Sequence, residues 1–447
     1  MPKIERVAAY EVLDSRGRPT VMAEVYAAGG IMGQALVPSG VSTGRHEAFE
    51  LRDENESRYR GLGVRQAVNN IEGEIHAAVL GQDTANQDKI DRIMLELDGT
   101  PTKSRLGANA VLATSLAVAR TEAVAQGLPL YLYLQQLFGR REAMLPVPQM
   151  NLINGGRHAS NKLSIQEYHL LPIGSQSFAE AMRMGVEIYY ALRELLSEEG
   201  FQVETADEGG FAPKLANSEL AFTFLVRAIE KAGYVPGVDA FLGIDAAASE
   251  FYDPEENSYL LDGTIISAVD LAYQYKLWRE RYPLISYEDP FAEDAWDDWQ
   301  RFLKQNGAVA QVIGDDLYAT NSTRIREGIV RGVTNAVLIK PNQVGTLTET
   351  LQAVLLAQEA GQNVVISHRS GETEDTFIAD LSVAVGAGQI KTGAPSRSER
   401  TAKYNRLLVI EKAIHGKLAG NLQRFLENMA PRSPAGASSP AARTQGV

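Results

Sequence analysis

The sequence predicts an α/β protein in which a βα-barrel follows a smaller α+β domain. Three observations lead to this prediction. The chain has 447 residues, 45% of them hydrophobic and 22% charged, which is enough to bury one large core and a smaller second one. Short apolar runs followed by helical stretches recur from about residue 145 onward. Many of these runs lead into a charged or polar residue, as barrel strands do on the face that carries catalytic groups.

Residues 1–140 are expected to form the smaller α+β domain. Apolar and polar residues alternate in three runs, IERVAAYEVL, TVMAEVYA and IMGQALV, which are separated by Asp-Ser-Arg-Gly and Gly-Gly. Such alternation between turn residues is typical of an antiparallel meander of strands. Apolar residues at helical spacing then predict helices, with Gly or Pro near most of their ends. These helices are expected at residues 64–80, 87–97, 108–126 and 130–137.

Residues 141–428 are expected to form the barrel. Their short apolar runs include FLGID, LISYED, QVIGDD, AVLIK, NVVISH and QIKTG. The polar residues into which these runs lead are Asp245, Glu288, Asp315, Lys340, His368 and Lys391. Because the carboxyl ends of barrel strands converge on one face, we expect these side chains to form one polar cluster. A doubly wound open sheet would show the same alternation, but the length and the number of repeated units favour the barrel.

The composition limits the remaining possibilities. Residues 429–447 are rich in Pro, Ala, Ser and Gly without periodicity, so a flexible tail is expected there. The net charge of −13 argues against general attraction to nucleic acid or to an anionic membrane. The absence of cysteine excludes disulfides and cysteine nucleophiles and suits a reducing compartment. Because no stretch has the apolar length of a signal core or a membrane span, a cytoplasmic protein is expected.

The acidic strand ends indicate a metal site. Asp245, Glu288 and Asp315 come from separate units of the expected barrel, and three uncompensated carboxylates in one site would repel each other strongly. Such a cluster needs a cation, and oxygen ligands in a chain without cysteine select a hard ion such as Mg2+. Any one of these acids alone would more often be a helix N-cap or a salt-bridge partner. Three acids at equivalent positions of separate units make a purely structural role less plausible.

Two lysines, Lys340 and Lys391, also end expected strands. A lysine in this position must be partly desolvated or paired, and both desolvation and a nearby metal ion favour a neutral amine that can accept a proton. An isolated lysine of this kind is more often part of a structural ion pair. Opposite a cluster of carboxylates and metal, a catalytic role becomes the better interpretation.

Three loops offer further candidate groups. His368, Arg369 and Ser370 lie in succession in ISHRSGETED, and a guanidinium and a hydroxyl suit phosphate oxygens. The loop PSGVSTG has glycine hinges and Ser42, so it is a candidate lid whose serine reaches a metal or a phosphate. Glu208 precedes two glycines in ADEGGFAP and is a candidate proton donor. Each loop, taken alone, would more often be a solvated turn.

Together these motifs resemble the enolase family. The resemblance runs in order across residues 14–408, nearly the whole chain. It rests on DSRGRPTV, PSGVSTG, EAFELRD, GANAVLATSLA, INGGRHA, QEY, DEGGFAP, SYEDP, GDDL, LIKPNQVGTLTET, SHRSGETED and KTGAPSRSERTAKYNRLL. The segments LIKPNQVGTLTET and SHRSGETED, together with the acidic residues, are the most specific part of this resemblance.

The resemblance implies an enolase-type βα-barrel whose first units depart from regular βα order, capped by the smaller N-terminal domain. It also implies a homodimer or an octamer assembled from four dimers. Two Mg2+ ions are implied for each active site. Asp245, Glu288 and Asp315 correspond to the ligands of the first ion. The second ion would enter with a small phosphorylated carboxylic acid substrate and involve Ser42.

Individual roles follow from the same resemblance. Lys340 matches the general base and Glu208 the general acid, which Glu167 supports. The residues that match groups binding the phosphate, hydroxyl or carboxylate of the substrate are His158, Gln166, His368, Arg369, Ser370 and Lys391. Two Mg2+ ions and a lysine can stabilise the charge that develops when a proton next to a carboxylate is removed.

Three positions depart from the usual enolase pattern. Val41 and Ala206 add bulk in GVSTG and TADEGG, and His169 puts an imidazole where a methionine is usual. The leading hypothesis is phosphopyruvate hydratase, which dehydrates 2-phosphoglycerate to phosphoenolpyruvate through an enediolate. An enolase-derived enzyme resembling carboxyphosphonoenolpyruvate synthase, from a phosphonate or phosphinate antibiotic pathway, is the alternative that these departures motivate.

Two further alternatives are weaker. A non-catalytic protein that reuses the fold is disfavoured because every expected catalytic position is filled. A mandelate-racemase-like enzyme acting on unphosphorylated acids is disfavoured because the Ser-His-Arg-Ser set suits phosphate.

Overall fold

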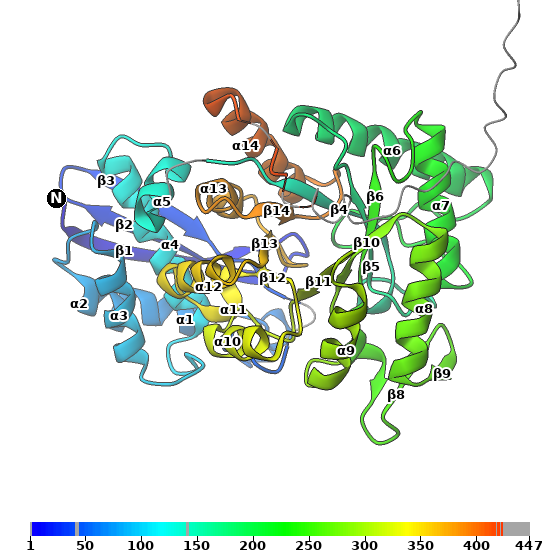
Figure 1. The fold of residues 1–447 in the computed structure, drawn as a ribbon. Helices are drawn as coiled ribbons and strands as arrows, with labels where there is room; N and C mark the ends of the chain where they lie inside the picture. The colour runs from blue at the N-terminus through cyan, green and yellow to red at the C-terminus, as the bar shows by residue number, and fades with distance from the viewer. Residues whose placement is uncertain (1, 41–43, 140–142, 417, 421, 423–447) are drawn as a thin grey trace, which may run out of the picture.

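The computed structural model describes residues 2–40, 44–139, 143–416, 418–420 and 422. Its N-terminal elements lie at one side of a closed barrel (Figure 1). The expected tail, residues 429–447, lies outside the described residues, as do Val41 and Ser42. Among the helices of the described part, none is long and apolar enough to cross a membrane.

The N-terminal elements form a three-stranded antiparallel sheet with helices on it. The strands are β1 (Ile4–Leu13), β2 (Pro19–Ala27) and β3 (Ile31–Leu36), in that order, and each matches one of the alternating runs. The helices are α1 (Arg65–Asn70), α2 (His76–Val79), α3 (Gln87–Asp98), α4 (Ala108–Ala125) and α5 (Leu130–Phe138). Helix α4 packs on β2 and β3 and is buried along nearly its whole length, which its Ala-rich sequence permits because small side chains allow close approach.

The helix predicted at residues 64–80 is interrupted. A π-helical turn at Ile71–Ile75 separates α1 from α2, with Gly73 at its centre. Glycine is a poor helix former, and single π turns are a known way for a helix to absorb an irregularity. Ile71 and Ile75 both stay buried beside β1, so the wider turn keeps the apolar contacts that the sequence pattern predicted.

The barrel is closed and has the strand order β10-β11-β12-β13-β14-β4-β5-β6. This confirms the predicted fold class. Strand β5 runs antiparallel to both β4 and β6, whereas the other neighbouring pairs are parallel, so the first units depart from regular βα order as the resemblance implied. The barrel strands are β4 (Val147–Asn154), β5 (Glu167–Leu171), β6 (Phe241–Asp245), β10 (Leu284–Glu288), β11 (Gln311–Gly314), β12 (Ala336–Ile339), β13 (Asn363–Ser367) and β14 (Gly388–Lys391).

Every residue of these eight strands is buried. Burial on both faces explains why strands such as β12 (AVLI) are apolar runs instead of alternating ones. A small sheet of β7 (Tyr252–Asp253), β8 (Ser258–Leu261) and β9 (Thr264–Ile266) follows β6. The remaining helices are α6 (Phe178–Glu198), α7 (Ser218–Lys231), α8 (Ala268–Arg281), α9 (Trp296–Asn306), α10 (Ser322–Arg331), α11 (Pro341–Val344), α12 (Leu347–Glu359), α13 (Phe377–Ala384) and α14 (Ser398–Ile414).

Side-chain caps fix where several of these helices begin. A cap oxygen accepts a hydrogen bond from a backbone N–H that the first helical turn leaves without a partner. The capping residues of α6, α7, α8, α10 and α12 are Ser177, Asn217, Ser267, Asn321 and Thr346. These caps hold the helices in place around the strands that they follow.

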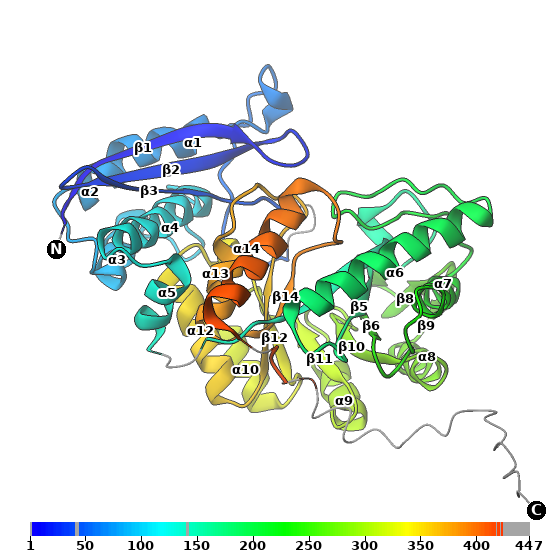
Figure 2. The same ribbon diagram turned by 90° about the horizontal axis from the view of Figure 1, so that it is seen from above.

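The N-terminal domain docks on the barrel beside α12, as both ribbon views show (Figures 1 and 2). Asp91 of α3 accepts hydrogen bonds from the backbone N–H and the hydroxyl of Thr348, at 3.0 and 2.6 Å. Ser115 of α4 accepts one from the N–H of Leu347 at 3.0 Å. Two residues of the small domain therefore cap a barrel helix, which fixes the domain over the carboxyl end of the barrel strands.

The opposite end of the barrel is closed by apolar side chains. Leu422 is fully buried there in one cluster with residues at the outer ends of β4, β5 and β6 and with Ile285 of β10. Leu418 packs against this cluster, and its neighbour Ala419 donates its N–H to the carbonyl of Leu145 at 2.9 Å. Apolar side chains therefore fill the barrel at the amino end of its parallel strands, and the pocket lies at their carboxyl end.

Candidate active site

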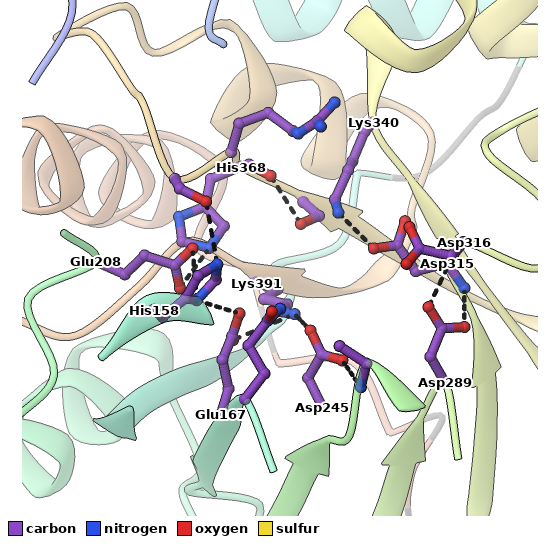
Figure 3. A pocket seen from close by; sticks show the side chains of 15 residues that line it. His158, Glu167, Glu208, Asp245, Asp289, Asp315, Asp316, Lys340, His368 and Lys391 are labelled. Carbon is purple, nitrogen blue, oxygen red and sulfur yellow. Dashed lines mark hydrogen bonds and ion pairs between the residues drawn. The ribbon is translucent and has the colours of Figure 1, made fainter. Parts of the chain in front are cut away.

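A pocket at the carboxyl end of the barrel strands collects nearly all the predicted site residues (Figure 3). It is lined by His158, Gln166, Glu167, Glu208, Asp245, Ala247, Asp289, Asp315, Asp316, Lys340, Ser367, His368, Arg369, Ser370 and Lys391. Of the predicted set, Glu288 lies just beside this lining, in contact with Lys391, and Ser42 lies outside the described residues. The polar residues at the ends of the strands therefore lie together in one cluster, as expected.

Lys391 lies at the centre of the pocket floor. Its ammonium is 2.8 Å from Asp245 Oδ2, 2.8 Å from Glu288 Oε1 and 3.2 Å from Glu167 Oε2. Although burial opposes it, these carboxylates hold the pKa of Lys391 well above its usual value. Lys391 is thus a fixed positive charge surrounded by three acids.

Glu167 reaches this floor because β5 runs backwards. It is the first residue of β5 and pairs with Asp245, the last residue of β6. In an antiparallel strand the beginning lies at the end where parallel neighbours finish. A search for polar residues at the ends of apolar runs therefore misses Glu167, and only the family resemblance indicated it.

Asp315 and Lys340 form an ion pair on the other side of the pocket. Asp315 also accepts a hydrogen bond from Gln343 Nε2 at 2.9 Å. Burial lowers the pKa of Lys340, but Asp315 outweighs it and raises the pKa above the usual value. The chain's own groups thus keep Lys340 charged, whereas desolvation and a nearby metal ion were expected to favour the neutral amine.

Asp289, which sequence reasoning missed, orders the loop after β11. Its two carboxylate oxygens accept the backbone N–H groups of Asp315 and Asp316 at 3.0 and 2.8 Å. Asp289 adopts a positive φ of 42°, an uncommon backbone conformation that recurs at functional sites. The signal available in the sequence was the second acid of SYEDP, directly after Glu288.

The carboxylates on this side fit a hard cation. Single oxygen atoms of Asp289, Asp315 and Asp316 lie within 4.8 Å of one another. Burial and the neighbouring acids raise the pKa of Glu288 well above its usual value, and its Oε2 is buried without a hydrogen-bond partner among the described residues. Crowded, buried carboxylates with an unused oxygen are what an ion such as Mg2+ would neutralise. The geometric group differs from the predicted ligands in having Asp289 and Asp316 beside Asp315.

Glu208 and Glu167 face each other with His158 between them. His158 Nδ1 is 3.5 Å from Glu167 Oε1 and 3.7 Å from Glu208 Oε1. Burial and the charge of Glu208 raise the pKa of Glu167 to about 8, against the opposing effect of Lys391. Burial also acts to raise the pKa of Glu208, but His158 and His368 outweigh it and lower the pKa. The pair therefore holds one proton near neutral pH, favoured on Glu167.

Asn151 of β4 supports this pair and was not predicted from the sequence. Its side-chain N–H donates to Glu208 Oε2 at 2.9 Å. The same oxygen lies 3.5 Å from His368 Nε2. Because Asn151 sits inside an apolar strand without a motif of its own, nothing in the sequence singled it out.

Arg369 and Ser370 line the side of the pocket next to the N-terminal domain. The Arg369 guanidinium donates to both carboxylate oxygens of Glu47, at 2.8 and 3.1 Å, and to Asn342 Oδ1 at 3.0 Å. Ser370 Oγ lies 3.3 Å from His158 Nε2. Glu47 comes from the N-terminal domain, so this domain holds in place an arginine that lines the pocket.

Arg400, which was not predicted from the sequence, holds these groups from behind. Its guanidinium donates to His368 Nδ1 at 2.6 Å and to the carbonyls of Arg369 and Ser370 at 2.7 and 2.6 Å. A guanidinium can only donate, so His368 accepts at Nδ1 and carries its proton on Nε2, which faces Glu208. Arg400 lies within the motif KTGAPSRSER, which was the available signal.

A closed barrel with acids, lysines and histidines gathered at the carboxyl ends of its strands defines a βα-barrel enzyme of acid–base type. Comparison with family models gives the family. A model described as the enolase C-terminal TIM barrel domain matches residues 142–425, and one described as the enolase N-terminal domain matches residues 4–134. The chain belongs to the enolase family. These two domains indicate a magnesium-dependent enzyme of the lyase type.

Proposed function

We propose that the protein interconverts 2-phosphoglycerate and phosphoenolpyruvate, as phosphopyruvate hydratases do. The observation that supports this best is the division of the pocket. A lysine base, Lys340, lies on one side and the carboxyl pair Glu167 and Glu208 on the other, with Lys391 between them (Figure 3). A dehydration that removes a proton from one carbon and hydroxide from the next needs a base and an acid placed in this way.

The substrate is held by its charged ends. We assign the phosphate to Arg369 and Ser370, because a guanidinium fork and a hydroxyl match phosphate oxygens. The carboxylate is assigned to the pocket floor near Lys391. His158, Gln166 and His368 line the wall beside the Glu167 and Glu208 pair and can donate to the substrate oxygens. Gln166 can also accept from the substrate hydroxyl, because its buried Oε1 lacks a partner among the described residues.

Asp245, Glu288 and Asp315 would hold the Mg2+ ion of the resting site, and Ser42 is assigned to a second ion that enters with substrate. When bound there, Mg2+ would supply positive charge that acidifies the C–H bond next to the substrate carboxylate and offsets the hold of Asp315 on the Lys340 proton. The crowded acids and the unpaired Glu288 oxygen described above support this assignment.

Two proton transfers complete the reaction. Lys340 Nζ takes the proton from C2, which leaves an enediolate whose added charge Lys391 stabilises. The C3–O bond of the hydroxyl then breaks and its electron pair stays with the oxygen, while the electrons of the former C2–H bond form the C2=C3 double bond. The leaving hydroxide receives a proton from Glu208, which Glu167 supports by passing on the proton that the pair holds, and departs as water. The products are phosphoenolpyruvate and water.

The test is the appearance of phosphoenolpyruvate absorbance when the purified protein is mixed with 2-phosphoglycerate and Mg2+. We expect turnover that EDTA abolishes and Mg2+ restores. A protein that binds Mg2+ but yields no phosphoenolpyruvate at any substrate concentration would contradict the proposal.

A second candidate is a reaction on a phosphonate-bearing acid, as in enzymes resembling carboxyphosphonoenolpyruvate synthase. The observation that favours it is His169, an imidazole in direct contact with Glu167, where methionine is usual in enolases. Efficient turnover of 2-phosphoglycerate would exclude this candidate as the main activity. Poor turnover, together with rapid product formation from a phosphonate analogue of 2-phosphoglycerate, would favour it.

A further inference from the structure

His169 lies inside the barrel, directly below Glu167. The two residues are both on the inward face of β5, because side chains two apart in a strand point the same way. His169 is fully buried. Its partner across the ladder to β6 is Gly243, where an added Cβ would lie 3.5 Å from the His169 Cβ and 3.2 Å from the Ser286 Cβ. The missing side chain at Gly243 leaves room for the imidazole.

The imidazole is bound to the carboxylate above it. His169 Nε2 lies 2.8 Å from Glu167 Oε2, a distance typical of a strong hydrogen bond. The other ring nitrogen, Nδ1, is buried and has no hydrogen-bond partner among the described residues. A neutral imidazole has one N–H. Glu167 Oε2 lies 3.2 Å from the Lys391 ammonium, which only donates, so Oε2 is the accepting oxygen and the proton that Glu167 holds lies on Oε1. The imidazole proton is therefore on Nε2. His169 therefore donates to Glu167.

The two oxygens of Glu167 consequently have different surroundings. Oε2 receives the His169 N–H and lies 3.2 Å from the Lys391 ammonium, so its acceptor positions face the barrel floor. Oε1 faces His158, at 3.5 Å, and the side of the pocket where Glu208 lies. With one oxygen anchored from below by two donors, the carboxyl group cannot rotate freely about its last bond.

We propose that His169 is a positioning residue, which anchors Glu167 Oε2 and so presents Glu167 Oε1 to the pocket as the oxygen that exchanges a proton with Glu208 and the substrate. The inference rests on the proposed dehydration, since it assigns His169 to the half of the reaction in which the hydroxyl leaves. It does not involve Lys340, which lies on the other side of the pocket. His169 should thus affect loss of the hydroxyl and leave removal of the C2 proton unchanged.

The kinetic test uses the full-length protein with Mg2+ and 2-phosphoglycerate. His169→Met has a side chain of similar size without a donor, and it should lower kcat by about 10-fold, the usual size of an effect transmitted through a supporting hydrogen bond, with little change in KM. Exchange of the C2 hydrogen in D2O, followed by proton NMR, should stay at the wild-type rate. His169→Gln restores an N–H donor and should recover most of the lost kcat.

The matched control is Leu170→Met, a change of similar volume at the next residue of β5, whose side chain points to the opposite face. It should leave kcat, KM and exchange unchanged. Unchanged kcat in His169→Met, an equal loss of exchange and turnover, or failure of His169→Gln to recover activity in a folded protein would each overturn the proposal.

A second measurement separates this inference from the proposed function. Nitrogen-15 chemical shifts distinguish protonation at Nε2 from protonation at Nδ1, and a buried N–H bonded to a carboxylate gives a slowly exchanging, downfield proton signal. We expect an Nε2–H signal that is absent in His169→Met and moves upfield in Glu167→Gln. A proton on Nδ1, or a signal insensitive to Glu167→Gln, would overturn the role of His169. Wild-type protein that shows this signal but neither exchange nor turnover would instead contradict the proposed dehydration.

Discussion

Lys340 shows how strongly one residue depends on its neighbour. Its ammonium is paired with Asp315, which is buried, while the Lys340 side chain is 13% exposed at the pocket wall. As a general base, Lys340 must lose a proton that Asp315 holds in place, so its reactivity is set by whatever competes for that carboxylate. The lysine and the acid therefore act as one unit, and changes at either should alter the proton transfer.

Replacing Lys340 by Ala should lower kcat by about 10²–10⁴-fold, because the base that removes the C2 proton is lost. Lys340→Arg is the matched control for charge. A guanidinium keeps the positive charge beside Asp315 but does not give up its proton at neutral pH, so this variant should be as slow as the alanine variant. Steady-state kinetics on both variants make the comparison. Recovery of turnover by arginine would show that charge, and not proton removal, is what the position supplies.

Arg369 tests the assignment of the phosphate. Replacing it by Ala should weaken binding of a phosphorylated ligand by about 1.5–3 kcal/mol, the usual contribution of hydrogen bonds to a charged group. The dissociation constant of an unphosphorylated analogue of the same acid should change far less. Calorimetric titration of both ligands gives the comparison, and equal losses would place the phosphate elsewhere.

The site residues that could be predicted from the sequence without the resemblance are mainly those that end an apolar run. Asp245, Glu288, Asp315, Lys340 and Lys391 each end an apolar run, and barrel geometry alone brings such residues together. Supporting residues such as Asn151 and Arg400 end no such run, and Asp289 directly follows Glu288 in the run LISYED. Their partners lie far away in the chain, at separations that local sequence does not encode.

Among the elements, α12 is notable because its first turn is capped from another domain. Asp91 lies on α3 and is almost wholly buried, and it accepts both the backbone N–H and the hydroxyl of Thr348. Burial raises the pKa of Asp91, which its hydrogen bonds partly offset. This contact joins α3 of the N-terminal domain to the first turn of the barrel helix α12.

Asp91→Ala should lower the free energy of unfolding by about 0.5–2 kcal/mol, the range for the loss of a helix N-cap. Asp88→Ala is the matched control on the same helix. Asp88 is exposed, and its ion-pair partner among the described residues is Arg92, one turn further along α3. Its loss should therefore change stability by at most about 0.5 kcal/mol. Urea unfolding of both variants measures the difference. Equal effects would show that the cap between the domains contributes nothing.

Elements with a strong period were predicted closely, and irregular ones were not. The three runs of the N-terminal sheet and the helices α3, α4 and α5 appear within a few residues of the predicted bounds. The π turn at Ile71–Ile75 was missed because apolar spacing continues across it. The resemblance implied only that the first units depart from regular βα order. The antiparallel direction of β5 itself was not predicted, since a short buried strand has no sequence signal for its direction.

For the whole molecule, binding of Mg2+ should couple to stability. The acids at the carboxyl end of the barrel come from β6, β10 and the loop after β11, so an ion held by them links three strands. Ligand binding to the folded state alone adds about 2.7 kcal/mol at a concentration 100 times the dissociation constant. Thermal unfolding should therefore shift upward with Mg2+ and return with EDTA. Glu288→Gln should reduce this shift, and an unchanged shift would remove Glu288 from the ligands.

The pairing of β4 with β14 has a consequence for how the protein is made. These strands close the barrel, yet β4 ends at Asn154 and β14 begins at Gly388, so most of the chain is translated between them. Strand β4 leaves the ribosome early, with one edge lacking its partner until the last part of the chain emerges, and such an edge invites wrong pairing. Nascent chains stalled before residue 388 should thus be cut by protease within the barrel segments, while those stalled after α14 should resist.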